Sequence, residues 1–246
     1  MAGNRTLAAA LDAELASRMD GSINGDLTCR AFVDSRFLEW MPSPSGTVWR
    51  KRLHRVGPIE SGQVTTVVRY DPGASFPTHD HPEGEEILVL DGVFSDEHGD
   101  WHAGSYLLNP EGFRHAPFSR SGCLLFVKLR QFPGVGRKHV VCDTHSLPWE
   151  SSLNAGVKCK LLYRQAEFVD SVRLEKWAPA TDCGIVQYDR GAELFVVEGE
   201  FSDIDGSYAA GCWLRLPAGT SHHPRSAGGC TVYIKEAGLA YLRSAV

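Results

Sequence analysis

The 246-residue chain lacks an excess of positive charge and a long apolar run. Its formal net charge is −5, so it has no global field that would attract nucleic acid or anionic lipid. No apolar stretch is long enough to cross a bilayer. The first thirty residues carry acidic side chains and no long apolar core, which argues against a signal peptide. We therefore expect no nucleic-acid partner, no membrane association and a cytoplasmic location.

Paired cysteine motifs are also missing. Seven cysteines are scattered along the chain, and no two of them form a C-x-x-C pair. An odd, scattered set argues against a disulfide framework and against a zinc-knuckle site. The sequence contains no nucleophile elbow, phosphate loop or dinucleotide fingerprint. These absences exclude several common kinds of catalytic and cofactor site.

Helical patterns are scarce. Apolar residues have helical spacing between Leu7 and Met19, and Gly21 is a plausible end for that helix. Beyond it lie short β-branched or aromatic segments, such as VTTVVRY at 64–70 and ELFVV at 193–197. The 25 Gly and 13 Pro fit many short strands separated by turns. The sequence predicts an all-β fold with a short N-terminal helix.

The chain repeats itself. Gly92 aligns with Gly199, an offset of 107 (199 − 92), and the same offset aligns FSD at 94–96 with FSD at 201–203. Other matched pairs are Pro72 and Pro179, Gly84 and Gly191, Gly104 and Gly211, Pro110 and Pro217, His115 and His222, and Lys128 and Lys235. Glycine and proline fix turns, so a shared register indicates two copies of one β domain. We predict a helical segment at 1–28, a first domain at 29–140 and a second at 141–246, joined near Gly134 to Pro148.

The first copy carries a cluster of metal-ligating residue types. Residues two apart on a strand share a face, so His79 and His81 project together. Glu85 follows a short bend and can turn back toward them, and His115 follows a second turn. Three imidazoles and one carboxylate suit Fe(II), Mn(II) or Zn(II). Glu86 is the competing carboxylate, but strand alternation should turn it away.

Two spaced motifs carry a resemblance to a known family. Residues 73–92 read G-x5-H-x-H-x3-E-x6-G, and residues 104–115 read G-x5-P-x-G-x2-H. They resemble the two signature motifs of the cupin superfamily, and residues 47–132 resemble the cupin domain of the ChrR-like group, named for a zinc-binding anti-sigma factor. The whole chain looks like a bicupin.

The resemblance implies two tandem jelly-roll β-barrels, the first of which holds one divalent ion (Fe, Zn or Mn). It implies His79, His81, Glu85 and His115 as the ligands. Ser119 stands where the second motif often has Asn, but that position does not ligate the metal. Residues 1–53 contain no histidine and one cysteine, so they do not match the zinc-binding module of the anti-sigma proteins, and the anti-sigma role is not carried over.

The second copy has lost most of these donors. The counterparts of His79, His81 and Glu85 are Val186, Tyr188 and Ala192, and the counterpart of His115 is His222. One imidazole does not hold a divalent ion against water, so the second barrel is predicted to be metal-free. Glu193, the counterpart of Glu86, should point outward. An alternative site of His222, His223 and Cys183 is less favoured.

Two functions remain open. The first is a mononuclear metal-dependent oxygenase, a cupin-type dioxygenase acting on a small diketone-like substrate whose pKa the metal lowers. Phe76, Phe113 and Phe126 would then shape an apolar pocket, and Glu85 could act as a base instead of a ligand. The alternative is a non-catalytic metal-bound sensor or a regulatory protein that binds a small ligand. The sequence also leaves open a monomer or a homodimer.

A basic run, WRKRLHR, occupies residues 49–55. Its alternation fits an exposed edge strand, where charged side chains would block unwanted strand pairing. The less favoured interpretation is a surface that grips an anionic partner.

Overall fold

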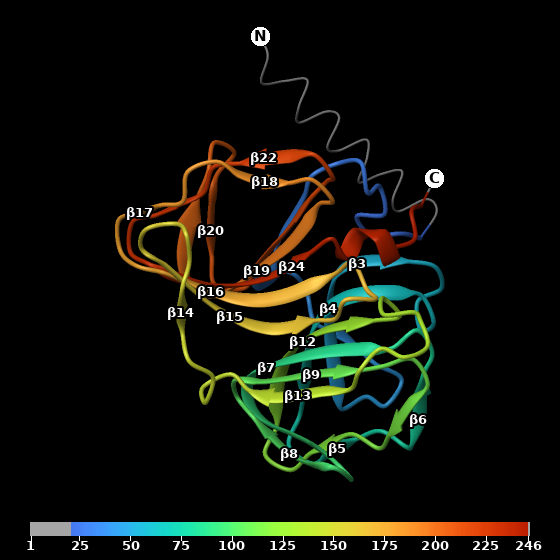
Figure 1. Cartoon of the computed structure of the whole chain (residues 1–246). Helices are drawn as coiled ribbons and strands as arrows, with labels where there is room; N and C mark the ends of the chain where they lie inside the picture. The colour runs from blue at the N-terminus through green and yellow to red at the C-terminus, as the bar shows by residue number, and fades with distance from the viewer. Residues whose placement is uncertain (1–20, 246) are drawn as a thin grey trace.

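The computed structural model describes residues 21–245 (Figure 1). The helix predicted between Leu7 and Met19 lies outside the described residues. Residues 21–28 form turns and one antiparallel bridge, between Ile23 and Arg55. No helix in the described range is long and apolar enough to span a membrane.

The all-β prediction is confirmed. Strands dominate both barrels, and the helical elements between residues 21 and 245 are the short 3-10 turns η1 (Ser35–Phe37) and η2 (Gly238–Tyr241). One ten-stranded sheet has the central order β13-β9-β7-β12-β4-β3-β2. Its strands are β2 (Met41–Pro42), β3 (Val48–Val56), β4 (Gln63–Tyr70), β5 (Ala74–Ser75), β7 (Glu85–Asp96), β8 (Gly99–His102), β9 (Ser105–Asn109), β11 (Phe118–Ser119), β12 (Cys123–Leu129) and β13 (Val140–Asp143). With the two-stranded sheet of β6 (His79–His81) and β10 (Phe113–His115), it forms the first barrel.

The second barrel repeats this plan, with the central order β1-β21-β19-β24-β16-β15-β14. Its strands are β1 (Ala31–Asp34), β14 (Glu150–Ser151), β15 (Val157–Arg164), β16 (Ser171–Trp177), β17 (Thr181–Asp182), β19 (Ala192–Ser202), β20 (Ser207–Ala209), β21 (Cys212–Leu216), β23 (Arg225–Ser226) and β24 (Cys230–Glu236). The two-stranded sheet here consists of β18 (Val186–Tyr188) and β22 (Thr220–His222).

The glycines that revealed the repeat have a structural reason. Gly92 and Gly199 have φ of +73° and +71°, a conformation that side chains disfavour. A Cβ atom on either glycine would lie 2.2 Å from a carbonyl oxygen, that of Gly122 or Gly229. The repeat therefore preserves a close backbone contact between corresponding strands of each barrel.

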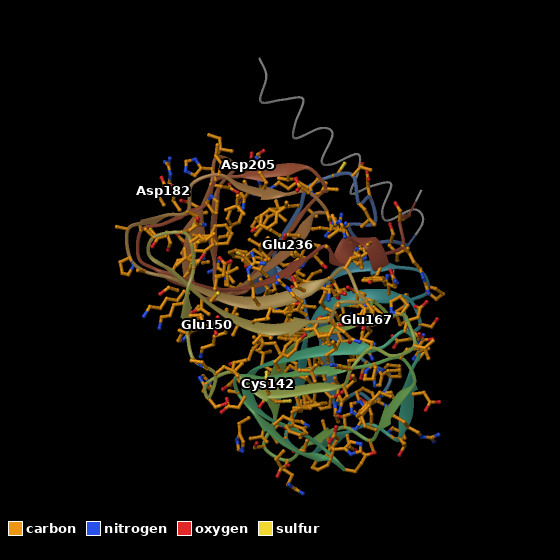
Figure 2. The ribbon with its side chains drawn as sticks, viewed as in Figure 1. Cys142, Glu150, Glu167, Asp182, Asp205 and Glu236 are labelled. Atoms are coloured by element: carbon orange, nitrogen blue, oxygen red, sulfur yellow. The ribbon has the colours of Figure 1, made fainter. Side chains whose placement is uncertain are left out.

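The two barrels exchange edge strands. β1, at the start of the described chain, pairs with β21 of the second barrel, whereas β13, which follows the first barrel, pairs with β9 of that barrel. Figure 2 shows Cys142 of β13 among the strands of the lower, first barrel. The predicted domain boundaries, 29–140 and 141–246, stay a prediction. In the structure, each ten-stranded sheet includes one strand, β1 or β13, that lies wholly or largely in the range predicted for the other domain.

An apolar layer joins the barrels. Phe126 of β12 stacks on Phe195 of β19, with ring centroids 4.4 Å apart, and meets Tyr233 of β24 edge-on at 5.2 Å. All three rings are buried. Burial of this much aromatic surface favours a fixed packing of one barrel on the other.

Two buried ion pairs cross the same layer. Lys128 Nζ lies 2.7 Å from a carboxylate oxygen of Glu193, and Lys235 Nζ lies 3.2 Å from one of Glu86. Each lysine belongs to one copy and each glutamate to the other, at positions related by the repeat. Glu86 faces away from Glu85, as strand alternation predicted. Glu193 also points out of its barrel, but into the buried layer between the barrels and not into solvent.

The expectation of an exposed edge strand at 49–55 is wrong. β3 lies between β2 and β4, because β2 adds a short strand outside it. Lys51, His54 and Arg55 are buried. Arg50 and Arg52 expose 21% and 12% of their side chains. The basic run is therefore part of the barrel wall.

Candidate metal centre

The histidines converge from two short strands. β6 and β10 pair antiparallel, with His115 opposite His79 and Phe113 opposite His81. One ring nitrogen from each of the three histidines lies within 4.8 Å of the others. His81 and His115 are buried, while His79 is partly exposed. The pairing of β6 with β10 thus brings the three imidazoles together.

Glu85 joins them from the first residue of β7. Its Oε2 atom lies 3.6 Å from Nε2 of His81 and 3.6 Å from Nε2 of His115. The chain reverses between β6 and β7 at Gly84, whose φ is +72°. A Cβ atom there would lie 2.8 Å from the carbonyl oxygen of Asn109, so only glycine fits this tight turn. The three histidines thus form one close group, and Glu85 lies beside two of them, His81 and His115.

Three outer contacts orient these donors. Nδ1 of His115 lies 3.1 Å from Oδ2 of Asp96, and Nδ1 of His79 lies 2.9 Å from the carbonyl oxygen of Pro77. When Nδ1 carries the hydrogen and donates it outward, Nε2 keeps a lone pair directed at the centre. Asn109 donates to Oε2 of Glu85 at 3.0 Å. Sequence reasoning missed Asp96 and Asn109 as parts of the site.

The donor set fits one divalent ion. The Nε2 atoms of His81 and His115 are 2.9 Å apart. Two nitrogens bound at right angles to one ion, each about 2.1 Å from it, would be ~3.0 Å apart. Two imidazole lone pairs at this separation need a positive charge between them, either a proton or a metal ion. The outward hydrogen bonds of His79 and His115 are compatible with a metal ion, because they leave the Nε2 atoms of these two rings free to ligate.

The electrostatics are those of a buried carboxylate–imidazole group. Burial lowers the pKa of His81, which favours the neutral ligand form. Burial also works against a charged His115, but the hydrogen bond to Asp96 and the charge of Glu85 raise its pKa overall. Despite desolvation, the bond to His115 holds the pKa of Asp96 below its usual value. Asp96 therefore stays anionic beside the site.

A cavity of about 270 Å³ opens beside the cluster. Its wall includes His79, His81 and Glu85, together with apolar side chains such as Tyr70 and Phe94. A larger cavity, of about 780 Å³, lies on the second barrel and contains no histidine. We assign the smaller cavity to the site because three of the four candidate ligands, all except His115, form part of its wall.

The three predicted pocket phenylalanines have different places. Phe76 lines the cavity, and its ring meets that of His79 at 6.0 Å. Phe113 packs edge-on against His115 at 5.6 Å but does not line this cavity. The prediction that Phe126 lines the pocket is wrong. Strand alternation turns Leu125 and Val127 toward the cavity and Phe126 into the layer between the barrels.

The second barrel has the same strands around different side chains. Val186 lies opposite His222 in the β18–β22 pair, as His79 lies opposite His115. Ala192 lies opposite Leu216, where the first barrel has Glu85 opposite Asn109. The carboxylate and the amide that supports it have thus both been replaced by apolar residues.

The alternative site in the second barrel does not assemble. Nε2 of His222 is 2.9 Å from Asp203 inside the barrel, and Nε2 of His223 is 2.6 Å from Asp182 on the surface. The His222 side chain is 2% exposed and that of His223 is 41% exposed, because neighbouring residues on the chain point to opposite sides. They do not converge on one ion.

Similar folds occur among solved structures. A protein from Nostoc punctiforme described as a candidate dioxygenase has a TM-score of 0.70 at 16% identity, over 87% of this chain and 84% of its own. A bacterial pirin from Escherichia coli in complex with nickel(II) has a TM-score of 0.65 at 12% identity, over 85% and 98%. An oxalate decarboxylase from Lactobacillus farciminis in a formate complex has a TM-score of 0.59 at 13% identity, over 88% and 86%. These likenesses show the fold.

No curated protein matches the chain. The family model for the ChrR cupin-like domain matches it twice, over residues 28–133 and 137–240. The two matches follow the internal repeat and together cover most of the sequence. With the two barrels described above, they show that this chain is a bicupin of the ChrR cupin-like family.

Proposed function

We propose that the protein is a mononuclear metal-dependent enzyme of the oxygenase type, acting on a small diketone-like substrate. The observation that carries this proposal is the convergence of three imidazoles and one carboxylate beside a small cavity. His79, His81, His115 and Glu85 would hold one divalent ion, Fe, Zn or Mn. A bound ion of this kind supplies Lewis acidity toward substrate oxygens and, if it is iron, redox chemistry with dioxygen.

The side chains of the chain itself would prepare the substrate. The wall of Phe76, Phe94 and Leu125 excludes water from one side of the donor cluster and suits a compact apolar body. Glu85 lines the cavity, and its carboxylate would either ligate the ion or, when it is not bound to the ion, accept a proton from the carbon between two carbonyl groups. Asp96 holds the His115 ring in place while that proton moves.

Iron-loaded protein tests the proposal when its oxygen uptake is measured with a panel of β-diketones. We expect uptake that depends on the diketone and is lost in the His79→Ala variant, because that variant removes one donor. His223→Ala is a suitable control, since that histidine lies on the surface of the second barrel. Iron bound at one equivalent without uptake on any diketone would contradict the enzyme and support the sensor.

A further inference from the structure

A second cavity, of about 190 Å³, adjoins the first and differs from it in charge. Both cavities have His79, His81 and Arg50 in their walls. The second one also has Arg52 and Arg130 in its wall. The wall on one side of the donor cluster is therefore mostly apolar, and the wall on the other side holds three arginines together with Glu60 and Asp80.

The two β3 arginines share one carboxylate. Nη1 of Arg50 lies 2.7 Å from Oε2 of Glu60, and Nη2 of Arg52 lies 3.3 Å from Oε1 of the same residue. Glu60 belongs to the turn between β3 and β4, and its side chain is 46% exposed. Two largely buried positive charges thus face one negative charge on an exposed turn. The excess charge at this place is positive.

The second barrel shows that the fold does not need these arginines. Val48 pairs with Tyr70 and Val157 pairs with Trp177, so β15 corresponds to β3. The counterparts of Arg50 and Arg52 are Cys159 and Leu161. The strands keep the same register and both carry a bulge after the second of these positions.

The next residue on the strand behaves differently. Lys51 donates to the carbonyl oxygen of Ser35, and its counterpart Lys160 donates to that of Thr144. Those lysines belong to the shared frame. The arginines occur only in the barrel that carries the donor cluster, which links them to the site and not to folding.

We propose that Arg50, supported by Arg52, binds an anionic group of the substrate, with Glu60 occupying that place until the substrate displaces it. The inference rests on the proposed function and narrows its substrate to small β-dicarbonyl carboxylates. A guanidinium presents two parallel N–H donors that match a carboxylate. The two cavities, of about 190 and 270 Å³, have room for a small diketone together with a carboxylate group.

A matched pair of probes tests this assignment. Pentane-2,4-dione is neutral, and 2,4-dioxopentanoate carries the same diketone with a carboxylate. Zinc-loaded protein, titrated calorimetrically, should bind the anion about tenfold more tightly or better, the effect of one charge-assisted hydrogen-bonded pair. Arg50→Gln should remove that preference, because it should weaken binding of the anion far more than binding of the neutral diketone.

Two further variants make the test independent of one substitution. Glu60→Gln removes the competing carboxylate, so it should raise the affinity for the anion several-fold and change that for the neutral probe much less. Arg120→Gln is the control, because Arg120 pairs with Asp100 away from both cavities and its side chain is 76% exposed. It should keep the wild-type preference.

The outcomes separate this inference from the proposed function. Equal affinity for the two probes in the wild type, or an equal loss of both in Arg50→Gln, overturns the anion subsite even if oxygen uptake is observed. An anion preference that Arg50→Gln abolishes supports the subsite, even if iron-loaded protein takes up no oxygen.

Discussion

The two barrels share the same strand order and turns, and they differ in the side chains at corresponding positions inside them. Both have a glycine, Gly92 or Gly199, in close contact with a neighbouring backbone carbonyl, and both have the same order of strands. Each also contributes a lysine and a glutamate that form ion pairs with the other barrel. The first has Glu85 opposite Asn109 where the second has Ala192 opposite Leu216. The comparison sorts many residues: the glycines, lysines and glutamates that both copies keep support folding and packing, and His79, His81 and Glu85 occur only in the first copy, although His115 and Asp96 have counterparts in the second.

His115 and His222 give the largest expected contrast. Both are buried, occupy corresponding strands and lie beside a corresponding aspartate. We expect His115→Ala to reduce the metal content from one equivalent to none, and His222→Ala to leave it unchanged, since only the first ring has other donors beside it. Elemental analysis of protein purified without chelator measures this. Equal metal loss in both variants would remove the distinction between the barrels.

The crossed ion pairs should matter to stability and not to metal binding. Lys128→Met leaves Glu193 buried without its partner, which should lower the free energy of unfolding by about 3–5 kcal/mol. The double variant Lys128→Met with Glu193→Met should recover most of that loss, because no uncompensated charge remains. Urea denaturation measures both. A double variant no more stable than the single one would show that the pair is not the cause.

The sequence predicted the fold and named candidate donors that lie close together in the structure. Alternation and turn spacing fixed which side His79 and His81 share, and the structure gathers both with Glu85 and His115. Asp96 was visible only as part of the FSD segment that both copies contain. The second copy has an aspartate, Asp203, at the corresponding position, so comparison of the copies suggested that Asp96 serves the shared fold. In the first barrel, however, Asp96 orients His115.

The remaining misses concern contacts between sheets. Phe126 was assigned to the pocket because it is aromatic, yet it belongs to the layer that joins the barrels. Strand periodicity shows that two neighbouring residues face opposite ways, but it does not show what covers each face. The same limit hid the burial of Glu193 and the exchange of β1 and β13, since these depend on the partner barrel.

Asp96→Asn should weaken metal binding without abolishing it. The substitution keeps the shape of the side chain but removes the charge that orients His115, and outer contacts of this kind change metal affinity by about 10–100-fold. Asp203→Asn, the matched change in the second barrel, should leave the affinity unaltered. Competition with a chelator of known affinity measures both. An equal effect of the two changes would mean that Asp96 acts through folding.

The smallest expected contrast between the two copies concerns stability in acid. It arises at a buried position where the second copy has an ionisable residue, Asp170, and the first copy does not. Burial raises the pKa of Asp170, but Lys235 and Arg137 outweigh it and hold that pKa below its usual 3.8. A carboxyl group whose pKa is lower in the folded state stabilises the protein at pH values above its pKa in the unfolded state. This contribution is lost as the pH falls through its pKa in the folded state. The corresponding residue in the first copy, Gln63, does not titrate.

Urea midpoints between pH 7 and pH 2.5 test this expectation. The wild type should lose stability below about pH 4, and Asp170→Asn should be less stable at pH 7 but lose less on acidification. Parallel pH curves for the two proteins would assign the acid sensitivity to other groups.

The location of the metal is the most direct test of the account. Anomalous X-ray diffraction at the absorption edge of the metal that copurifies with the protein would locate each ion within the chain. We predict one peak per chain, between the Nε2 atoms of His81 and His115 and within bonding distance of His79 and Glu85. A peak in the second barrel, or metal-containing crystals without a peak at this cluster, would contradict it.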